Sequence, residues 1–202
     1  MFPLGLVLLP GMTLPLRLFE PRYLQMYADI IDSDRTFGVV LIERGLESRD
    51  DNLTFGTGCT AHILGSGINE DGTIGIIAIG RQRIRIEEWL EPDPYPRAMV
   101  TELEDDPLTD AGRRAVQEAM DQVPGLLGVA AELNPELSPI PPELADDPEQ
   151  AIYQMAQLAG LPSWDMQKVL EAPSSDSRAS LVNEMLAETV ELIRLQLEVG
   201  GG

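Results

Sequence analysis

Three residue types that often build reactive sites occur only once each in the 202 residues: Cys59, His62 and Lys168. A single cysteine excludes an internal disulfide and is typical of a reducing compartment, so we expect a cytoplasmic protein. A nucleotide phosphate loop ends in Gly-Lys-Ser or Gly-Lys-Thr. Because Gln167 precedes the one lysine, the chain has no such loop, and we predict no ATPase activity.

Long apolar runs are also absent. No stretch approaches the roughly 20 residues that a membrane-spanning helix needs. The apolar N-terminus has no basic leader, and its prolines and Gly11 interrupt it, so we predict neither a signal peptide nor a membrane partner. Hydrophobic residues still make up 44% of the chain, which is enough for a globular protein with a sizeable core.

Positive charge is scarce, and the formal net charge is −20. Residues 1–100 hold 14 acidic and 9 basic side chains, whereas residues 101–202 hold 20 acidic and 5 basic ones. A protein that binds a nucleic-acid backbone needs the opposite sign. We therefore expect a solvated acidic surface and no nucleic-acid partner.

The opening residues predict a strand, a turn and a helix in close succession. Leu6–Leu9 is a short apolar run, typical of a strand buried on both faces. Pro10-Gly11 fits a type II turn, because glycine accepts a positive φ at the third turn position. After an extended piece over Met12–Leu18, Pro21 suits the first position of a helix.

Strand patterns continue to about residue 104. They cover Phe37–Ile42, Gly56–Leu64, Thr73–Ile79, Gln82–Trp89 and Arg97–Leu103, with a loop at Glu43–Asn52. Asp71-Gly72 predicts a hairpin turn between two of them. Short strands of this number predict a compact, mostly antiparallel barrel or sandwich over residues 1–104.

Helical periodicity replaces the strand pattern over residues 105–202. Thr109 or Asp110 caps a helix that we expect to stop at Pro124-Gly125. A Pro-rich connection over residues 134–148 leads to a helix capped by Asp147. Ser163 caps a short helix that stops before Pro173, and Ser175 or Asp176 starts the longest helix, which ends near Leu197. We therefore predict an α+β chain whose second domain is a helical bundle.

Several segments carry a resemblance to a known family. They are Pro3–Tyr23, Phe37–Ile42, Gly56–Ala61 and Gly80–Ile86, followed by Leu161–Glu171 and Arg178–Leu181. In this order they resemble the N-terminal domain of Lon protease, as found in small stand-alone bacterial proteins. The resemblance implies a PUA-like β-pseudobarrel with one early helix, followed by a C-terminal helical bundle.

The same resemblance implies a non-enzymatic module that recognises polypeptide, without a motor or peptidase. The family's peptidase uses a serine activated by a lysine, and neither motif is present. Ser174, Ser175 and Ser177 lie near Lys168 in sequence, but serines between helices are commonly caps. We therefore assign no catalytic, cofactor-binding or metal-binding residue, and the sequence identifies no peptide-binding residue.

Two groups invite a more specific interpretation. Cys59 and His62 are three apart on a predicted strand, so they point to opposite faces and do not converge on a metal. Arg81, Arg83 and Arg85 share a strand face, where they form either an anion site or a solvent-facing stripe paired with neighbouring acids. We favour the stripe. Glu20, Arg22 and Tyr23, within the family-like motif, are expected to fix the junction of strand and helix.

Three functions remain open. The first is a module that binds exposed apolar polypeptide segments and delivers them to a separate protease. The second is an RNA-binding PUA-like module, which requires a basic face. The third is a hydrolase, which requires a polar pocket around His62. The resemblance and the net charge both favour the first.

Overall fold

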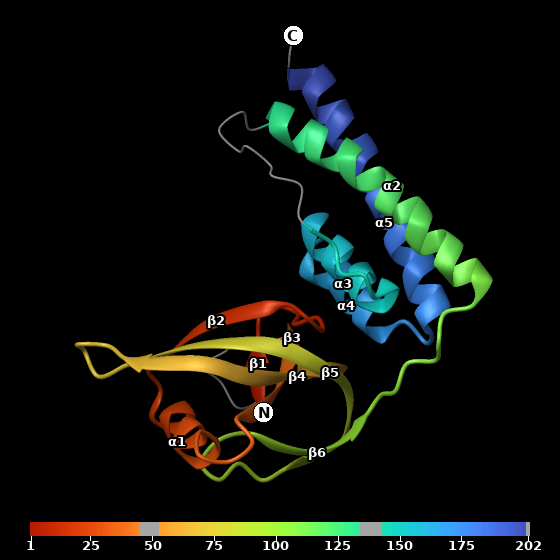
Figure 1. The fold of residues 1–202 in the computed structure, drawn as a ribbon. Coiled ribbons are helices and arrows are strands. Elements are labelled where there is room, and N and C mark those ends of the chain that lie inside the picture. The colour runs from red at the N-terminus through yellow and green to blue at the C-terminus, as the bar shows by residue number, and fades with distance from the viewer. Residues whose placement is uncertain (45–52, 134–142, 201–202) are drawn as a thin grey trace. The chain divides into compact units, whose positions relative to one another are not determined.

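The computed structural model describes residues 1–44, 53–133 and 143–200, and the chain divides into two compact units (Figure 1). We call Met1–Glu104 the sheet unit and Asp105–Gly202 the helical unit. In the described residues, the first holds six strands and one helix and the second holds four helices. The predicted α+β class is confirmed, whereas closure into a barrel and assembly as a bundle stay predictions.

One mixed sheet contains all the strands of the sheet unit. They are β1 (Phe2–Leu4), β2 (Thr13–Leu18), β3 (Thr36–Arg44), β4 (Leu53–Ile68), β5 (Ile74–Leu90) and β6 (Arg97–Glu102). The order is β1-β3-β4-β5-β2, and β6 also pairs with β5. β1 and β3 are parallel, and the other pairs are antiparallel. The first half of β5 binds β2 and the second half binds β6.

The apolar run Leu6–Leu9 is not a strand, which corrects the prediction. Val7, Leu8 and Leu9 are buried as expected, but the strand is formed earlier, by Phe2–Leu4. Burial alone does not distinguish a strand from an irregular buried segment. A Cβ at Gly80 would overlap the Leu9 carbonyl, so glycine at this position of β5 allows the segment to approach the sheet.

The type II turn after this segment is confirmed. Gly11 has a φ of 77°, and the Met12 amide donates to the Leu9 carbonyl at 3.0 Å. Gly11 and Met12 also exchange hydrogen bonds with Gly80, each at 2.9 Å. The turn is therefore fastened to β5 directly before β2 begins.

Helix α1 (Pro21–Ile30) begins with Pro21, as predicted. It buries Tyr23 and Met26, and the Tyr23 ring stacks on Phe2 with 4.0 Å between the ring centroids. Arg22 pairs with Glu20 at 2.9 Å and lies over the Tyr23 ring. Glu20, Arg22 and Tyr23 thus fix the junction of strand and helix, which confirms their expected structural role.

The segment Ile74–Leu90 is one long strand, whereas the sequence predicted two. The sheet bends at register shifts between β5 and its neighbours instead of breaking the strand. The predicted Asp71-Gly72 turn is confirmed, with a φ of 80° at Gly72. Asp71 accepts hydrogen bonds from the Thr73 hydroxyl and amide, which lower its pKa, and it pairs with Arg17. Of the predicted loop Glu43–Asn52, residues 43 and 44 belong to β3, and the rest lies outside the described residues.

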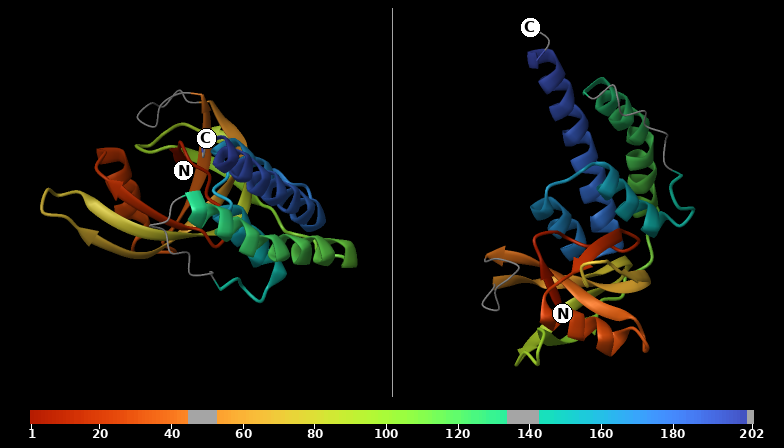
Figure 2. Two further views of the ribbon diagram at one scale, coloured as in Figure 1. Left: turned by 90° about the horizontal axis from the view of Figure 1, so that it is seen from above. Right: turned by 90° about the vertical axis from the view of Figure 1, so that its left-hand side faces the viewer.

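The helical unit consists of α2 (Asp110–Leu133), α3 (Pro148–Leu158), α4 (Ser163–Glu171) and α5 (Ser175–Gly200). Figures 1 and 2 show α2 and α5 side by side. Pro124 lies inside α2, so the predicted stop at Pro124-Gly125 is wrong. Val123, Leu126 and Val129 are buried on both sides of the proline, and tertiary packing of this kind offsets its cost of about 3 kcal/mol.

Side-chain caps position the helix starts. Asp147 accepts from the Glu149 amide at 3.1 Å, and Thr109 accepts from the Ala111 amide at 3.2 Å, so both predicted caps are confirmed. Asp176, in the first turn of α5, accepts from the Thr109 hydroxyl and, at 2.9 Å, from its amide. This contact links the starts of α2 and α5. Ser163 is the first residue of α4 and not its cap, which is Pro162.

Candidate functional site

An apolar cavity of about 390 Å³ lies within the sheet unit. Its apolar lining includes Met1, Met26, Ile30, Phe37, Ile84, Leu90, Ala98 and Val100, from α1 and from β3, β5 and β6 or beside them. Its size falls in the range of roughly 300 to 1,000 Å³ that is usual for ligand pockets. Protein pockets that bind ligands are commonly lined by apolar residues in this way.

The rim of the cavity is open to solvent. Leu90 is 38% exposed and Val100 is 40% exposed, and both line the cavity. Trp89 and Met99 are exposed to a similar or greater degree, at 40% and 57%, but neither lines it. Apolar side chains that stay in water contribute little to folding, and a contiguous group of them marks a surface for binding.

Polar groups near the cavity bind other protein groups. The Tyr95 hydroxyl donates to Asp29 at 2.9 Å, and burial together with the Asp29 charge raises the pKa of this tyrosine. The Met1 ammonium donates to the Pro96 carbonyl at 2.7 Å, and burial lowers its pKa to about 6. Arg97 donates to the Glu91 carbonyl at 3.0 Å. Tyr95 and Arg97, which also line the cavity, therefore have polar partners within the protein.

The predicted arginine stripe on β5 is wrong. Arg83 is only 5% exposed, whereas Arg81 and Arg85 are exposed, so the three do not form one solvent-facing face. The register of β4 on β5 shifts between Cys59 and Ala61, opposite this part of β5. The register from Arg83 to Arg85 is regular, so these two side chains share a strand face, and Arg83 is buried because that face is covered at its position but not at Arg85.

Cys59 and His62 do not form a reactive pair. Cys59 is fully buried, and desolvation raises the pKa of its thiol to about 12, so the nucleophilic thiolate does not form near neutral pH. His62 lies beside the Thr36 hydroxyl, with 3.5 Å between that oxygen and Nδ1. Across the described residues, no group of His, Cys, Asp and Glu is arranged to hold a metal. Cys59 is thus a small buried apolar residue, as predicted.

Two of the three serines near Lys168, Ser174 and Ser177, serve as caps. The Ser177 amide donates to the Ser174 hydroxyl at 3.2 Å, and the Ser174 amide donates to the Ser177 hydroxyl at 3.1 Å. Ser175 is buried in the first turn of α5. Lys168 pairs with Asp165 at 2.8 Å. The capping interpretation of Ser174 and Ser177 is confirmed.

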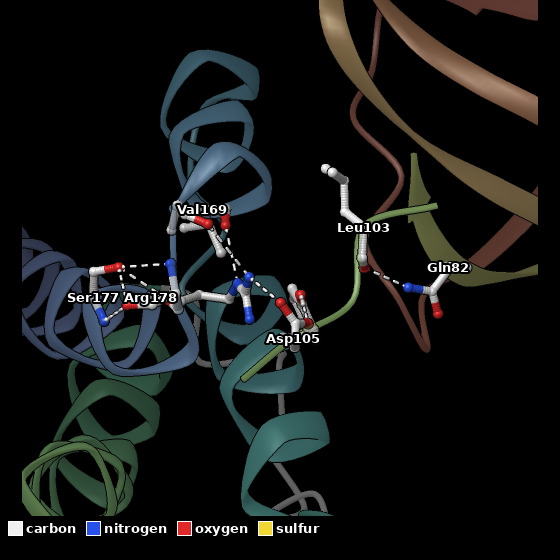
Figure 3. A network of polar contacts seen from close by, with 9 residues as sticks. Gln82, Leu103, Asp105, Val169, Ser177 and Arg178 are labelled. Carbon is white, nitrogen blue, oxygen red and sulfur yellow. Dashed lines mark hydrogen bonds and ion pairs between the residues drawn. The ribbon is translucent and has the colours of Figure 1, made fainter. Parts of the chain in front are cut away.

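A buried arginine network in the helical unit was missed by the sequence analysis (Figure 3). Arg178 is fully buried and pairs with Asp105 at 2.8 Å. Its Nε donates to the Val169 carbonyl at 3.3 Å, and its guanidinium lies 5.0 Å from the centroid of the Tyr153 ring. The sequence does contain a signal for the burial of Arg178. This residue is spaced at i, i+4 and i+7 with Val182 and Met185, and residues with this spacing share one face of a helix.

Figure 3 also shows how the end of the sheet unit is held. The Gln82 side-chain amide donates to the Leu103 carbonyl, and the Leu103 amide donates to the Arg83 carbonyl at 2.9 Å. These bonds fasten the residue after β6 to β5. Arg178 is fully buried, and both sets of contacts hold backbone segments together, so we assign them a structural role.

Comparison with known proteins identifies a family match over most of the chain. The model of the ATP-dependent protease La (LON) substrate-binding domain matches residues 1–188. Lon protease of Methylocella silvestris is 29% identical over 97% of this chain, and that of Cytophaga hutchinsonii is 25% identical over 96%. In both cases the chain spans only 24% of the relative's length. Protein cereblon of Danio rerio is 36% identical over 42% of this chain.

Two solved structures share the fold. A Lon N-terminal domain protein from Xanthomonas campestris superimposes with a TM-score of 0.62 at 24% identity, covering 92% of this chain and 95% of its own. The N-terminal domain of the Mycobacterium avium complex Lon protease gives a TM-score of 0.65 at 20% identity, covering 92% and 97%. None of the helices in the described ranges is long and apolar enough to cross a membrane.

Proposed function

Because the chain belongs to the family of the Lon substrate-binding domain, we propose that it binds exposed apolar segments of polypeptides and has no motor or peptidase activity of its own. The observation that carries this proposal is the apolar cavity of the sheet unit with its exposed rim at Leu90 and Val100. Unfolded chains expose apolar side chains that folded proteins bury, so such a cavity selects for them. Delivery of the bound segment to a separate protease is part of the proposal.

The expected affinity is weak. If a segment buries roughly 300 Å² of apolar surface, the gain is about 7 kcal/mol at about 25 cal/mol per Å². Association costs at least about 4 kcal/mol in lost translational and rotational freedom. The difference of about 3 kcal/mol corresponds to a dissociation constant in the millimolar range, and further contacts tighten it. A transient interaction of this strength suits a module that binds many different segments.

RNA binding has less support. The net charge of −20 repels a phosphate backbone, and the arginine cluster predicted on β5 is interrupted by the burial of Arg83. The hydrolase alternative also has less support, because among the described candidates the Cys59 thiol is buried with a raised pKa and the serines at the start of α5 are caps or buried. Both alternatives become outcomes of the test.

The test is fluorescence anisotropy with one labelled uncharged apolar peptide and one labelled single-stranded RNA, each titrated over a salt series. Burial of apolar surface changes little with salt, whereas binding of six to ten phosphates falls by about 10³ to 10⁵ between 50 and 200 mM salt. We expect peptide binding that holds or improves as salt rises, and no RNA binding. RNA binding that collapses with salt, or turnover of ATP or casein by the pure protein, would contradict the proposal.

A further inference from the structure

The outer edge of β6 is not paired with any of the described strands. Among the described strands, β5 alone pairs with β6, which lies at an edge of the sheet and is green in Figure 1. In an antiparallel pair, every second residue directs its N–H and C=O away from the partner strand. Such a row is a template for one more strand.

This edge also borders the apolar cavity. Ala98 and Val100 of β6 line it together with Met26 and Ile30 of α1. The four middle residues of β6, Ala98–Thr101, carry no charge, so the strand lacks the central charges that commonly protect an edge. A chain paired with β6 would therefore lie beside the cavity and place every second side chain over it.

The charges around β6 define what such a chain would carry. From Ile84, where β5 begins to pair with β6, to residue 104 the chain contains six acidic side chains and two basic ones, Arg85 and Arg97. Glu87, Glu88 and Glu102 are exposed on the two paired strands. Arg97 already donates to the Glu91 carbonyl and lies 4.0 Å from Asp93. The excess of negative charge attracts lysine and arginine and disfavours acidic segments.

We infer that the cavity takes its polypeptide as an extended strand that adds to the free edge of β6. The bound segment has apolar side chains at every second position and basic residues at its ends. Main-chain hydrogen bonds supply affinity that does not depend on sequence, while the cavity and the acidic surroundings select the side chains. This inference rests on the proposed function and names the form and charge of the substrate.

Backbone N-methylation of a peptide tests the inference. The probe is a labelled eleven-residue peptide in which valine alternates with threonine between terminal lysines. One variant is methylated at the amides of the odd residues, and the other at the amides of the even ones. A strand added to β6 donates through one of the two sets only. We expect one variant to lose about tenfold or more in affinity, and the other to bind within about twofold of the parent peptide.

Two further measurements complete the test. Replacing the terminal lysines with glutamates should weaken binding, most at low salt, and bound peptide should slow hydrogen exchange at alternate amides of Arg97–Glu102. If the two methylated peptides bound with equal affinity, or if bound peptide did not slow hydrogen exchange in β6, strand addition would be wrong. The proposed function would still stand. Failure of the unmethylated peptide to bind would overturn both.

Discussion

The two units use their interiors differently. In the sheet unit, apolar side chains surround a cavity of about 390 Å³ that opens at Leu90 and Val100. In the helical unit, the Arg178 side chain occupies the space among α3, α4 and the first residues of the unit, with its charge opposed by Asp105. An open apolar surface is available to a ligand, whereas a buried ion pair restricts how helices can assemble. The helical unit also has a hollow, of about 590 Å³, but charged residues such as Lys168 and Glu184 line it, so we place binding of apolar segments in the sheet unit.

The charge distribution follows the same division. The sheet unit holds 9 of the 14 basic side chains, and the helical unit holds 5 basic side chains in its 98 residues. One of those five basic side chains, that of Arg178, is buried and pairs with Asp105. The surface of the helical unit is therefore strongly acidic, and its role in the proposal is to keep the protein soluble and to repel nucleic acid.

The largest effect is expected from Arg178→Met. Loss of the guanidinium leaves Asp105, whose side chain is only 20% exposed, without its cation, and breaking a pair of this kind costs about 3 to 5 kcal/mol. Each unit contains one tryptophan, Trp89 or Trp164, so single-tryptophan variants followed in urea report on the units separately. We expect the Trp164 transition to shift and the Trp89 transition to stay in place.

Arg194→Met is the matched control, because Arg194 is exposed on the same helix. It should change stability by no more than about 0.5 kcal/mol. Equal shifts of both tryptophan signals in the Arg178 variant would show that the two units unfold together. That outcome would contradict the prediction of two domains at 1–104 and 105–202.

The reciprocal experiment is Leu9→Ala. Leu9 is fully buried beside β5, and truncation of a buried leucine costs about 2 to 5 kcal/mol. The Trp89 transition should now shift while the Trp164 transition does not. Leu64→Ala, at a leucine that is 54% exposed, should have an effect of less than about 1 kcal/mol. A large loss of stability in Leu64→Ala together with a small loss in Leu9→Ala would contradict the assignment of Leu9 to the core and of Leu64 to the surface.

Smaller effects on stability are expected from replacing two aspartates, one in each unit. Hydrogen bonds from Thr109 lower the pKa of Asp176, and those from Thr73 lower the pKa of Asp71, both from an ordinary value of 3.8. A carboxyl whose pKa is lowered on folding stabilises the fold above its unfolded pKa, and this contribution is lost as pH falls through the folded value.

We therefore expect Asp176→Asn to flatten the acid dependence of the Trp164 transition below about pH 4, and Asp71→Asn to do so for the Trp89 transition. Urea unfolding at a series of acidic pH values measures both. A steeper loss of stability with falling pH in either variant would contradict the lowered pKa of the replaced carboxyl. If one substitution changed both tryptophan transitions equally, the two units would be coupled in unfolding.

Local signals in the sequence were sufficient for much of the fold. Turn chemistry predicted Gly11 and Gly72, and capping rules predicted Thr109 and Asp147, because each depends on a few adjacent residues. Long-range contacts decided the rest. Pro124 stays within α2 because buried residues on both sides hold the helix together.

The candidate site was harder to predict than the fold. Its lining is spread from Met1 to Val100, and no local pattern marks residues that meet only when β6 and α1 border the same space. Burial of Arg83 and Arg178 was missed for a similar reason, since charged residues are rarely buried unless a distant partner compensates them. The family resemblance supplied the expectation of polypeptide binding, but no residue for it.

The measurement that tests the central claim most directly compares Val100→Glu with Met99→Glu. The two residues are neighbours on β6 and are 40% and 57% exposed, but only Val100 lines the cavity. A carboxylate at position 100 places charge against apolar side chains, so the labelled apolar peptide should bind about tenfold more weakly or worse. The Met99 variant should bind within about twofold of the parent protein, with both variants showing native circular dichroism. Unchanged binding by the Val100 variant, or equal loss in both, would contradict the assignment of the cavity as the polypeptide site.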